Sequence, residues 1–325
     1  MSDPEVSVVI PTRNRWPMLS AHALSSALAQ EDVEIEIVVV DDASDDGTAE
    51  YVEAHSDPRV RLVRNERNRR LPASRNVGAS VARGAWLAFL DDDDLWSPRK
   101  LRAQLDSARA SDASWVYAQC VVVDAELRPL DLHPFPAPDE LDALLRGGNH
   151  VPGGGSNVIV RAKTFGEIGR FDESLQFFED WDLWLRLVQV TLPAACPEVL
   201  VARVEHGSNM LFRDEVDIGA TFERILAKQG PVSDEQRLAV AEWVAHEHVR
   251  AGRNLGAAEH YARAALRFRS PGNALAAVGA LGGRRGLQLV SRLLVATRGK
   301  THLDEATSSA PPVAPSWLRE RTEAA

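Results

Sequence analysis

The first 123 residues alternate short β-rich runs with segments of helical spacing, and this alternation constrains the fold more than any other feature. Parallel strands need long crossover connections, which are usually helices. We therefore expect an α/β fold with a mostly parallel, Rossmann-like sheet flanked by helices. Strands are expected at 6–11, 34–41, 59–64, 85–90, 114–123, 156–161 and 199–205, and helices at 17–30, 46–55, 72–83, 98–110, 139–146 and 177–190.

The chain has 325 residues, enough for one large α/β domain and an appendage. We place the α/β domain at 1–212. Beyond residue 214 the spacing becomes helical throughout, which predicts a helical C-terminal region at 213–299. Residues 300–325 are rich in Ala, Ser, Thr and Pro, a composition that predicts a disordered tail. The expected helices of the C-terminal region are 214–228, 233–251, 255–268 and 284–297.

Charge is unevenly distributed along the chain. The formal net charge of −10 argues against nucleic acid as a partner. Residues 261–300 contain eight basic residues and no acidic one, so this segment carries +8 and the rest of the chain −18. Two interpretations remain open: a solvated helix face, or peripheral contact with an anionic membrane surface.

Sequence features also suggest the compartment. No apolar stretch approaches the roughly 20 residues needed to cross a bilayer, and the acidic N-terminus shows no signal-peptide pattern. The two cysteines, Cys120 and Cys196, each have apolar neighbours, which favours buried free thiols. We expect a cytoplasmic protein, with any peripheral membrane contact at the inner face.

Polar clusters follow three of the expected strands. They are 11–15 (Pro-Thr-Arg-Asn-Arg), 41–42 (Asp-Asp) and 91–94 (four aspartates). Ligands of open α/β sheets bind outside the carboxyl ends of the strands, so parallel strands would gather these clusters into one acidic crevice. Four adjacent carboxylates repel one another unless a hard cation such as Mg²⁺ or Mn²⁺ lies among them. A solvated acidic turn is the alternative.

Two further candidates lie in the second half. Glu179 and Asp180 begin an amphipathic helix, where the helix dipole favours acids even without a function, so Asp180 could be only a cap. His206 follows an expected strand, but a lone histidine is more often a packed or surface residue than a ligand. Local chemistry alone leaves both residues undecided.

Together, four ordered segments resemble the family 2 glycosyltransferases of the GT-A fold. The resemblance covers about residues 5–210 and is specific because all four segments occur in order. It implies a nucleotide-binding half at 1–123 and an acceptor half at 124–212. The segments are VSVVIPTRNR at 6–15, IVVVDDASDDGT at 37–48, ASRNVGASVARGAWLAFLDDDDLWSPRKL at 73–101 and IGRFDESLQFFEDWDLWLRL at 168–187.

The resemblance also implies residue roles. Asp180 corresponds to the catalytic base, and Asp93 corresponds to a direct ligand of Mn²⁺ or Mg²⁺, although the run of four aspartates leaves an ambiguity of one place. His206 corresponds to a position close to the metal or diphosphate, yet the acid beside it, Glu205, is unusual there. The residues that would bind the nucleotide-sugar are Pro11, Thr12, Asn14, Asp41, Asp42, Arg75, Asp91 and Asp92.

The implied reaction is an inverting displacement. An acceptor hydroxyl would attack the anomeric carbon of a UDP-, dTDP- or GDP-sugar while Asp180 takes its proton. The acceptor would be a saccharide, a lipid-linked sugar or a small molecule, as in cell-envelope polysaccharide or glycolipid synthesis. Two alternatives remain: a sugar-nucleotide nucleotidyltransferase, although the loop at 11–17 lacks the glycines typical of that class, and a non-catalytic nucleotide-sugar-binding protein.

Overall fold

Strands and helices alternate through the first half of the chain, as expected. The computed structural model describes residues 3–175, 177–206, 218–250, 252–298 and 312–324. The five strands expected before residue 124 are all present, and two-residue β5 was not expected. The elements are β1 (Val6–Thr12), a helical segment made of α1 (Trp16–Leu19), the π-helical turn η1 (Ser20–Leu24) and α2 (Ser25–Leu28), then β2 (Ile35–Asp41), α3 (Thr48–Glu53), β3 (Val60–Arg64), α4 (Leu71–Val81), β4 (Trp86–Phe89), β5 (Leu95–Trp96), α5 (Lys100–Ser111) and β6 (Trp115–Val123).

The second half begins with less regular structure and ends in helices. Two helices were expected at 139–146 and 177–190, and both are present but shorter. The elements are β7 (Pro129–Leu132), α6 (Leu141–Leu145), the 3₁₀ turn η2 (Gly154–Ser156), β8 (Ile159–Arg161), α7 (Ala162–Glu167), α8 (Glu179–Val188), β9 (Ala194–Val204), α9 (Ile218–Ala227), α10 (Asp234–Arg250), α11 (Asn254–Phe268), α12 (Pro271–Leu281), α13 (Gly283–Arg298) and α14 (Ser316–Ala324).

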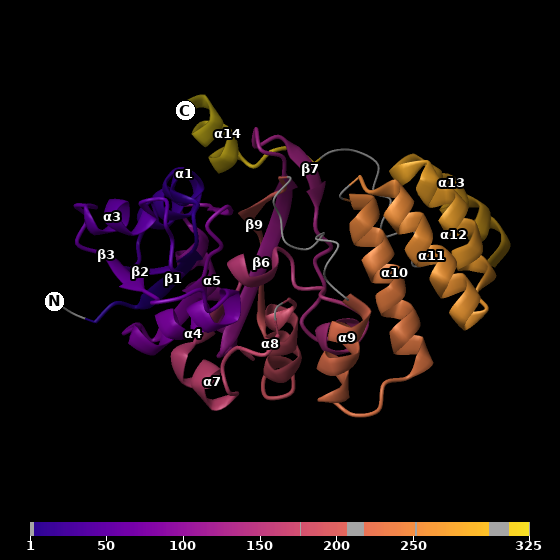
Figure 1. Ribbon diagram of the computed structural model, residues 1–325, viewed down its shortest axis with the longest axis horizontal. Coiled ribbons are helices and arrows are strands. Elements are labelled where there is room, and N and C mark those ends of the chain that lie inside the picture. The colour runs from indigo at the N-terminus through magenta and orange to yellow at the C-terminus, as the bar shows by residue number, and fades with distance from the viewer. Residues whose placement is uncertain (1–2, 176, 207–217, 251, 299–311, 325) are drawn as a thin grey trace. The chain divides into compact units, whose positions relative to one another are not determined.

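One mixed sheet contains all nine strands, in the order β3-β2-β1-β4-β8-β6-β9-β5, with β7 paired to β6. The neighbours β3, β2, β1 and β4 are parallel, as the alternation predicts. Beyond β4, β8 runs antiparallel to both β4 and β6, while β6 and β9 are parallel. Figure 1 shows the parallel strands in indigo and violet with α3, α4 and α5 around them. The predicted α/β class is confirmed.

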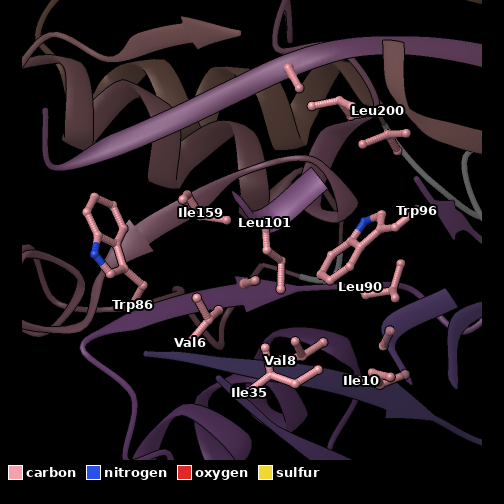
Figure 2. Packing of buried hydrophobic residues seen from close by; sticks show 14 of the residues in the cluster. Val6, Val8, Ile10, Ile35, Trp86, Leu90, Trp96, Leu101, Ile159 and Leu200 are labelled. Atoms are coloured by element: carbon pink, nitrogen blue, oxygen red, sulfur yellow. The ribbon is translucent and has the colours of Figure 1, made fainter. Parts of the chain in front are cut away.

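The core lies between the sheet and its helices. Every residue of β1 and β2 is buried, as expected for parallel strands that are covered on both faces. Val8 and Ile10 of β1 pack with Leu101 of α5 and with Trp96 of β5 (Figure 2). This packing fixes the strands in register, so the carboxyl ends of β1, β2 and β4 meet at one edge.

The chain divides into two compact units, which we describe separately. Unit 1 comprises 1–142, 149–206 and 311–325, and unit 2 comprises 143–148 and 207–310. In unit 2, α10, α11, α12 and α13 lie side by side, with α11 packed against α10 and α12 (Figure 1). The sequence did not predict α12, because its Gly- and Ala-rich stretch lacks a polar face. No helix of the described residues is long and apolar enough to cross a membrane.

The expectation of a disordered tail at 300–325 is wrong for its last part. Residues 299–311 lie outside the described residues, but α14 is an ordered helix that belongs to unit 1. Leu318 is 1% exposed and packs against Leu95, Val121 and Val204, and Trp317 Nε1 donates to the carbonyl of Val199 at 2.8 Å. Two adjacent apolar side chains therefore anchor a segment whose composition suggests disorder.

Replacing Leu318 with Ala should release α14 from the sheet. Removing a buried leucine side chain costs about 2–5 kcal/mol, which would raise the population of the detached helix by roughly 100-fold. Trypsin should then cut at Arg319 and Arg321 roughly 100-fold faster, as followed by mass spectrometry. The control is Val313→Ala, because Val313 is 81% exposed. Equal cleavage rates in both variants would contradict the docking role of Leu318.

Candidate active site

The four consecutive aspartates after β4 face different surroundings. Asp94 is anchored in the protein: its carboxylate accepts hydrogen bonds from Ser156 Oγ at 2.6 Å and from the Val204 amide at 3.0 Å. Among the three aspartates of this run that form ion pairs, Asp91 is the most exposed: 34% of its side chain is exposed, against 8% for Asp92 and 12% for Asp93. The Asp-x-Asp pair could be either Asp91 with Asp93 or Asp92 with Asp94. Because Asp94 already accepts hydrogen bonds from η2 and β9, we favour Asp91 with Asp93.

Residues after β1 hold the middle of the aspartate run. Thr12 Oγ1 donates to Asp92 at 2.8 Å. Arg15 Nη1 lies 3.1 Å from Asp92 Oδ1 and 3.0 Å from Asp93 Oδ2, so one guanidinium binds both carboxylates. The structure thus brings the first and third polar clusters together. The sequence placed Arg15 in the first cluster but gave it no role.

Two histidines contact Asp93. His206 Nε2 lies 3.0 Å from Asp93 Oδ2, and both side chains are mostly buried. His22, on the π-helical turn, places Nδ1 3.0 Å from the carbonyl oxygen of Asp93, and since a carbonyl only accepts, Nδ1 is the donor. His206 thus lies beside Asp93, while its expected position close to the metal or diphosphate stays a prediction. His22 was not predicted, because nothing in its local sequence marks it.

Burial and mutual repulsion shape the ionisation of the run. Burial and the neighbouring Asp93 raise the pKa of Asp92 to about 7, although Arg15 opposes the shift. Burial and the charges of Asp93 and Asp91 also raise the pKa of Asp94 well above its usual value. Burial disfavours ionised Asp93 too, but the hydrogen bond with His206 and the charge of Arg15 outweigh it and lower its pKa. The surroundings of Asp93 therefore favour its ionised form, whereas those of Asp92 and Asp94 favour the neutral form.

Arg75 lies buried beneath the site and joins its two sides. Its guanidinium forms ion pairs with Asp91 and with Glu179, the latter at 2.6 Å. Burial would lower the pKa of Arg75, but Asp91, Glu179 and Asp180 more than offset this and raise it. A Cβ on Gly155 would lie 2.6 Å from the guanidinium, so the backbone of η2 closes over Arg75. The predicted contact of Arg75 with the ribose or diphosphate stays a prediction.

Asp180 is the more accessible acid of the Glu-Asp pair. Phe178 adopts a left-handed conformation (φ 61°), so α8 begins directly with Glu179 and Asp180. Asp180 Oδ1 accepts from the Trp181 amide at 2.7 Å, and Oδ2 accepts from Asn149 Nδ2 at 3.1 Å. Burial raises the pKa of Asp180, which Arg75 and these hydrogen bonds partly counter. The pKa of the neighbouring Glu179 rises to about 7, chiefly by burial.

The glycine-rich turn at 153–155 has a steric reason. Gly153 and Gly154 have positive φ values of 68° and 56°. A Cβ on Gly154 would lie 2.8 Å from Asp180 Oδ2, which leaves no room for a side chain. The turn is therefore shaped to pass close to Asp180 and Arg75, and is not a spacer.

The remaining predicted nucleotide-binding residues fix loops at the same edge. Asp42 accepts from Asn65 Nδ2 and from the amides of Arg69 and Arg70, all at 2.8 Å. Asp41 is fully buried and pairs with Arg64 at 3.3 Å. Both acids therefore order the chain that follows β2 and β3. The contact of Asp42 with the base, with Asp41 beside it, stays a prediction.

Residues 11–15 reach this edge from β1. Pro11 is buried and lies in register with Val40 of β2. The pairing of β1 with β4 ends at Val9, so the N–H that proline lacks would have no partner in β4. Asn14 Oδ1 accepts from the Asp45 amide at 2.9 Å, joining the loops after β1 and β2. The structure thus gathers every predicted site residue at the carboxyl edge or directly beside it.

The sheet order β3-β2-β1-β4, with a polar site at its carboxyl edge, is that of a doubly wound, Rossmann-like α/β protein. Residues 7–169, half of the chain, match the protein family described as "Glycosyl transferase family 2". The chain therefore belongs to glycosyltransferase family 2. The match ends before α8, so it does not reach Asp180 or His206.

Several relatives carry related descriptions. The chain is 38% identical over 191 residues to the succinoglycan biosynthesis protein ExoO of Rhizobium meliloti, covering 55% of this chain and 54% of ExoO. It is 31% identical to the putative colanic acid biosynthesis glycosyl transferase WcaA of Escherichia coli, covering 58% and 67%. It is 30% identical to WfgD of E. coli, a UDP-Glc:α-D-GlcNAc-diphosphoundecaprenol β-1,3-glucosyltransferase, covering 58% and 72%. The chain thus spans about half the length of ExoO.

Solved structures support the fold. The S. aureus protein TarS, in a crystal structure of residues 1–349 with UDP, aligns with a TM-score of 0.56 over 93% of this chain and 89% of that 1–349 chain. The sequences are 17% identical, so the likeness shows the fold alone. TarS 1–349 has also been solved with UDP-GlcNAc and aligns with a TM-score of 0.53.

Proposed function

We propose that this chain transfers a sugar, with inversion, from a nucleoside-diphosphate sugar to an acceptor hydroxyl. The observation that carries the proposal is the buried Arg75, which bonds Asp91 on one side and Glu179, next to Asp180, on the other. One guanidinium thus sets the spacing between the aspartates expected to hold the donor and the acid expected to serve the acceptor. Family membership and the likeness to UDP-bound TarS support a nucleotide-sugar donor.

We propose that the donor side holds Mn²⁺ or Mg²⁺. Among the described residues no three His, Cys, Asp or Glu side chains form a metal-binding group. Asp93 and His206 nevertheless supply an oxygen and a nitrogen, and Mg²⁺ in phosphate-binding sites often uses only one or two protein ligands plus substrate oxygens. We infer that Asp93 holds the ion with His206 beside it. When bound, the ion would neutralise charge on the departing diphosphate.

On the acceptor side, Asp180 is the proposed general base. Its carboxylate takes the proton from the acceptor hydroxyl as that oxygen bonds to the anomeric carbon and the bond to the diphosphate oxygen breaks. Glu179 is unsuited to this role because its carboxylate is buried against Arg75. Asn149 and the Trp181 amide orient Asp180 and favour its ionised form.

The relatives suggest the acceptor class. ExoO and WcaA are described by their roles in succinoglycan and colanic acid biosynthesis, and WfgD by transfer to a lipid-linked GlcNAc diphosphate. We propose that this chain also works in cell-envelope polysaccharide synthesis, on a saccharide or lipid-linked acceptor. The donor base and sugar remain to be measured.

Calorimetric titration of UDP, GDP and dTDP tests the proposal directly. One nucleotide should bind in the presence of Mn²⁺, and its affinity should fall at least about tenfold in EDTA or in Asp93→Ala, since even outer-shell metal partners contribute 10–100-fold. The control is Asp106→Ala, an exposed carboxylate on α5 that should bind normally. If none of the three nucleotides binds with or without metal, the donor site and the proposed activity are wrong.

Replacing Asn149 with Leu should change the pH dependence of transfer. The hydrogen bond from Asn149 lowers the pKa of Asp180, so its loss raises that pKa. Because the base must be ionised, activity is lost as pH falls through this pKa, and the acid limb of kcat/KM should move to higher pH. The rate at high pH should be largely retained. A uniform loss of rate at every pH, with an unmoved limb, would indicate a merely structural role.

A further inference from the structure

Unit 2 carries an exposed surface of leucines and arginines that its own folding does not use. We call it the Arg/Leu surface and define it by six side chains, two from each of three helices. They are Leu266 and Arg267 of α11, Leu275 and Val278 of α12, and Arg285 and Leu289 of α13. Helix α12 lies between α11 and α13 and packs against both.

The apolar part of the surface is large and faces outward. Leu266 is 84% exposed, Val278 69% and Leu289 62%. The hydrophobic cluster that joins α10, α11, α12 and α13 contains five alanines among its eight buried residues, including Ala257, Ala276 and Ala280. Several large apolar side chains of α11, α12 and α13 thus stay outside a cluster that is rich in small ones. The exposed leucines therefore need a reason outside the unit.

The exposed side of α12 has no charged residue at all. Its exposed positions include Ala274, Leu275, Val278 and Leu281, which at about 3.6 residues per turn occupy roughly one third of the helix circumference. Two glycines let α12 and α13 approach closely, because a Cβ on Gly286 would lie 2.0 Å from the carbonyl oxygen of Gly279. An apolar strip therefore runs along α12 between its two neighbours.

The charges around this strip are positive and uncompensated. Arg267, Arg269, Arg285 and Arg292 form no ion pair with any residue that the structure describes. Residues 261–300 contain no acid, in a chain whose total charge is −10. Arg263 is different, because Glu259 pairs with it one turn away. Arginines on the two helices that flank an apolar strip match the pattern of a helix surface that lies in the headgroup region of an anionic bilayer.

We propose that the Arg/Leu surface docks unit 2 onto an anionic lipid bilayer. The leucines and valine would enter the boundary between headgroups and acyl chains, and the arginines would bind lipid phosphates. A second copy of the chain fits less well, because a symmetric contact would place the arginines of one copy against those of the other. Nucleic acid would satisfy the arginines and leave the leucines without a partner. This inference does not rest on the proposed transferase activity.

Vesicle co-sedimentation of the full chain tests this inference. Vesicles that contain phosphatidylglycerol should bind the protein, and vesicles of phosphatidylcholine alone should bind it much more weakly. Each arginine near an anionic surface contributes about fivefold, so Arg267→Gln with Arg285→Gln should weaken binding about 25-fold. Leu275→Ser with Val278→Ser should weaken it about tenfold.

The matched control is Val190→Ser with Leu192→Ser, which removes two exposed apolar side chains of unit 1 (67% and 55% exposed). This variant should bind vesicles as the natural chain does. Unchanged vesicle binding in either surface variant would overturn the inference, as would equal binding to both lipid mixtures. Binding of duplex DNA as tight as that of vesicles would also overturn it. So would a dimer, detected by light scattering, that dissociates in either surface variant. Nucleotide titration of the same variants separates this result from a failed donor site.

Discussion

Replacing Asp180 with Asn should lower the rate of sugar transfer by about 10²–10⁴-fold, the usual contribution of a positioned general base. The substitution keeps the shape of the side chain and its hydrogen bond from the Trp181 amide. It removes the carboxylate that would take the proton from the acceptor hydroxyl. Donor binding should stay within about twofold, because Asp180 is not expected to contact the nucleotide. Initial rates with radiolabelled or mass-resolved product, together with calorimetry, measure both quantities.

Glu179→Gln is the matched control for that experiment. Glu179 is adjacent, has the same chemistry and already has a pKa raised to about 7 by burial, so a neutral side chain is tolerated there. We expect this variant to keep its rate within about tenfold. If Glu179→Gln lost transfer and Asp180→Asn retained it, the roles of the two acids would be exchanged. If both variants kept full activity, the base would lie elsewhere.

Replacing Arg75 with Met should destabilise unit 1 by about 3–5 kcal/mol, because removing one partner of a buried ion pair leaves the other charges uncompensated. Arg75 is 1% exposed and is bonded to both Asp91 and Glu179. Urea unfolding followed by tryptophan fluorescence reports on unit 1, since every tryptophan except Trp243 lies there. A cost below about 1 kcal/mol would contradict the bridging role.

The cost should also depend on pH. Without Arg75, burial and Asp180 would raise the folded-state pKa of Glu179 further above its ordinary value of 4.5. A carboxyl group with a raised folded-state pKa binds its proton more tightly in the folded chain, so stability is greatest at low pH and is lost as pH rises through that pKa. The destabilisation should therefore be larger above about pH 7 than near pH 5. The control is Arg128→Met, an exposed ion pair whose loss should leave the unfolding midpoint unchanged.

Local patterns predicted most of the fold because they report local causes. The apolar runs of β1, β2, β4 and β6 and the polar residues that follow them were sufficient to place strands and their carboxyl ends. The sequence did not predict β5, β7, α7, α12 or α14. Helix α12 has too few polar residues to show a helical period, and two-residue β5 is too short to show any period. Helix α14 depends on Trp317 and Leu318 finding a distant hydrophobic cluster.

The candidate site shows the same division. The sequence alone determined which residues carry charge and which strands deliver them, so Asp93 and Asp180 could be named from motifs. It could not show that Arg75 bonds both Asp91 and Glu179, which are 16 and 104 positions away. Nor could it show that Asn149 orients Asp180, because such contacts depend on how the chain returns to the sheet edge.

The sequence by itself determined the fold class, the family and the chemical types at the site, because strand periodicity, turn residues and acidic runs are local properties of the chain. Only the tertiary structure decided how the four aspartates divide their roles. Asp94 is committed to Ser156 and Val204, whereas Asp93 meets His206. Neighbouring carboxylates have identical chemistry, so only partners brought from elsewhere in the fold can distinguish them.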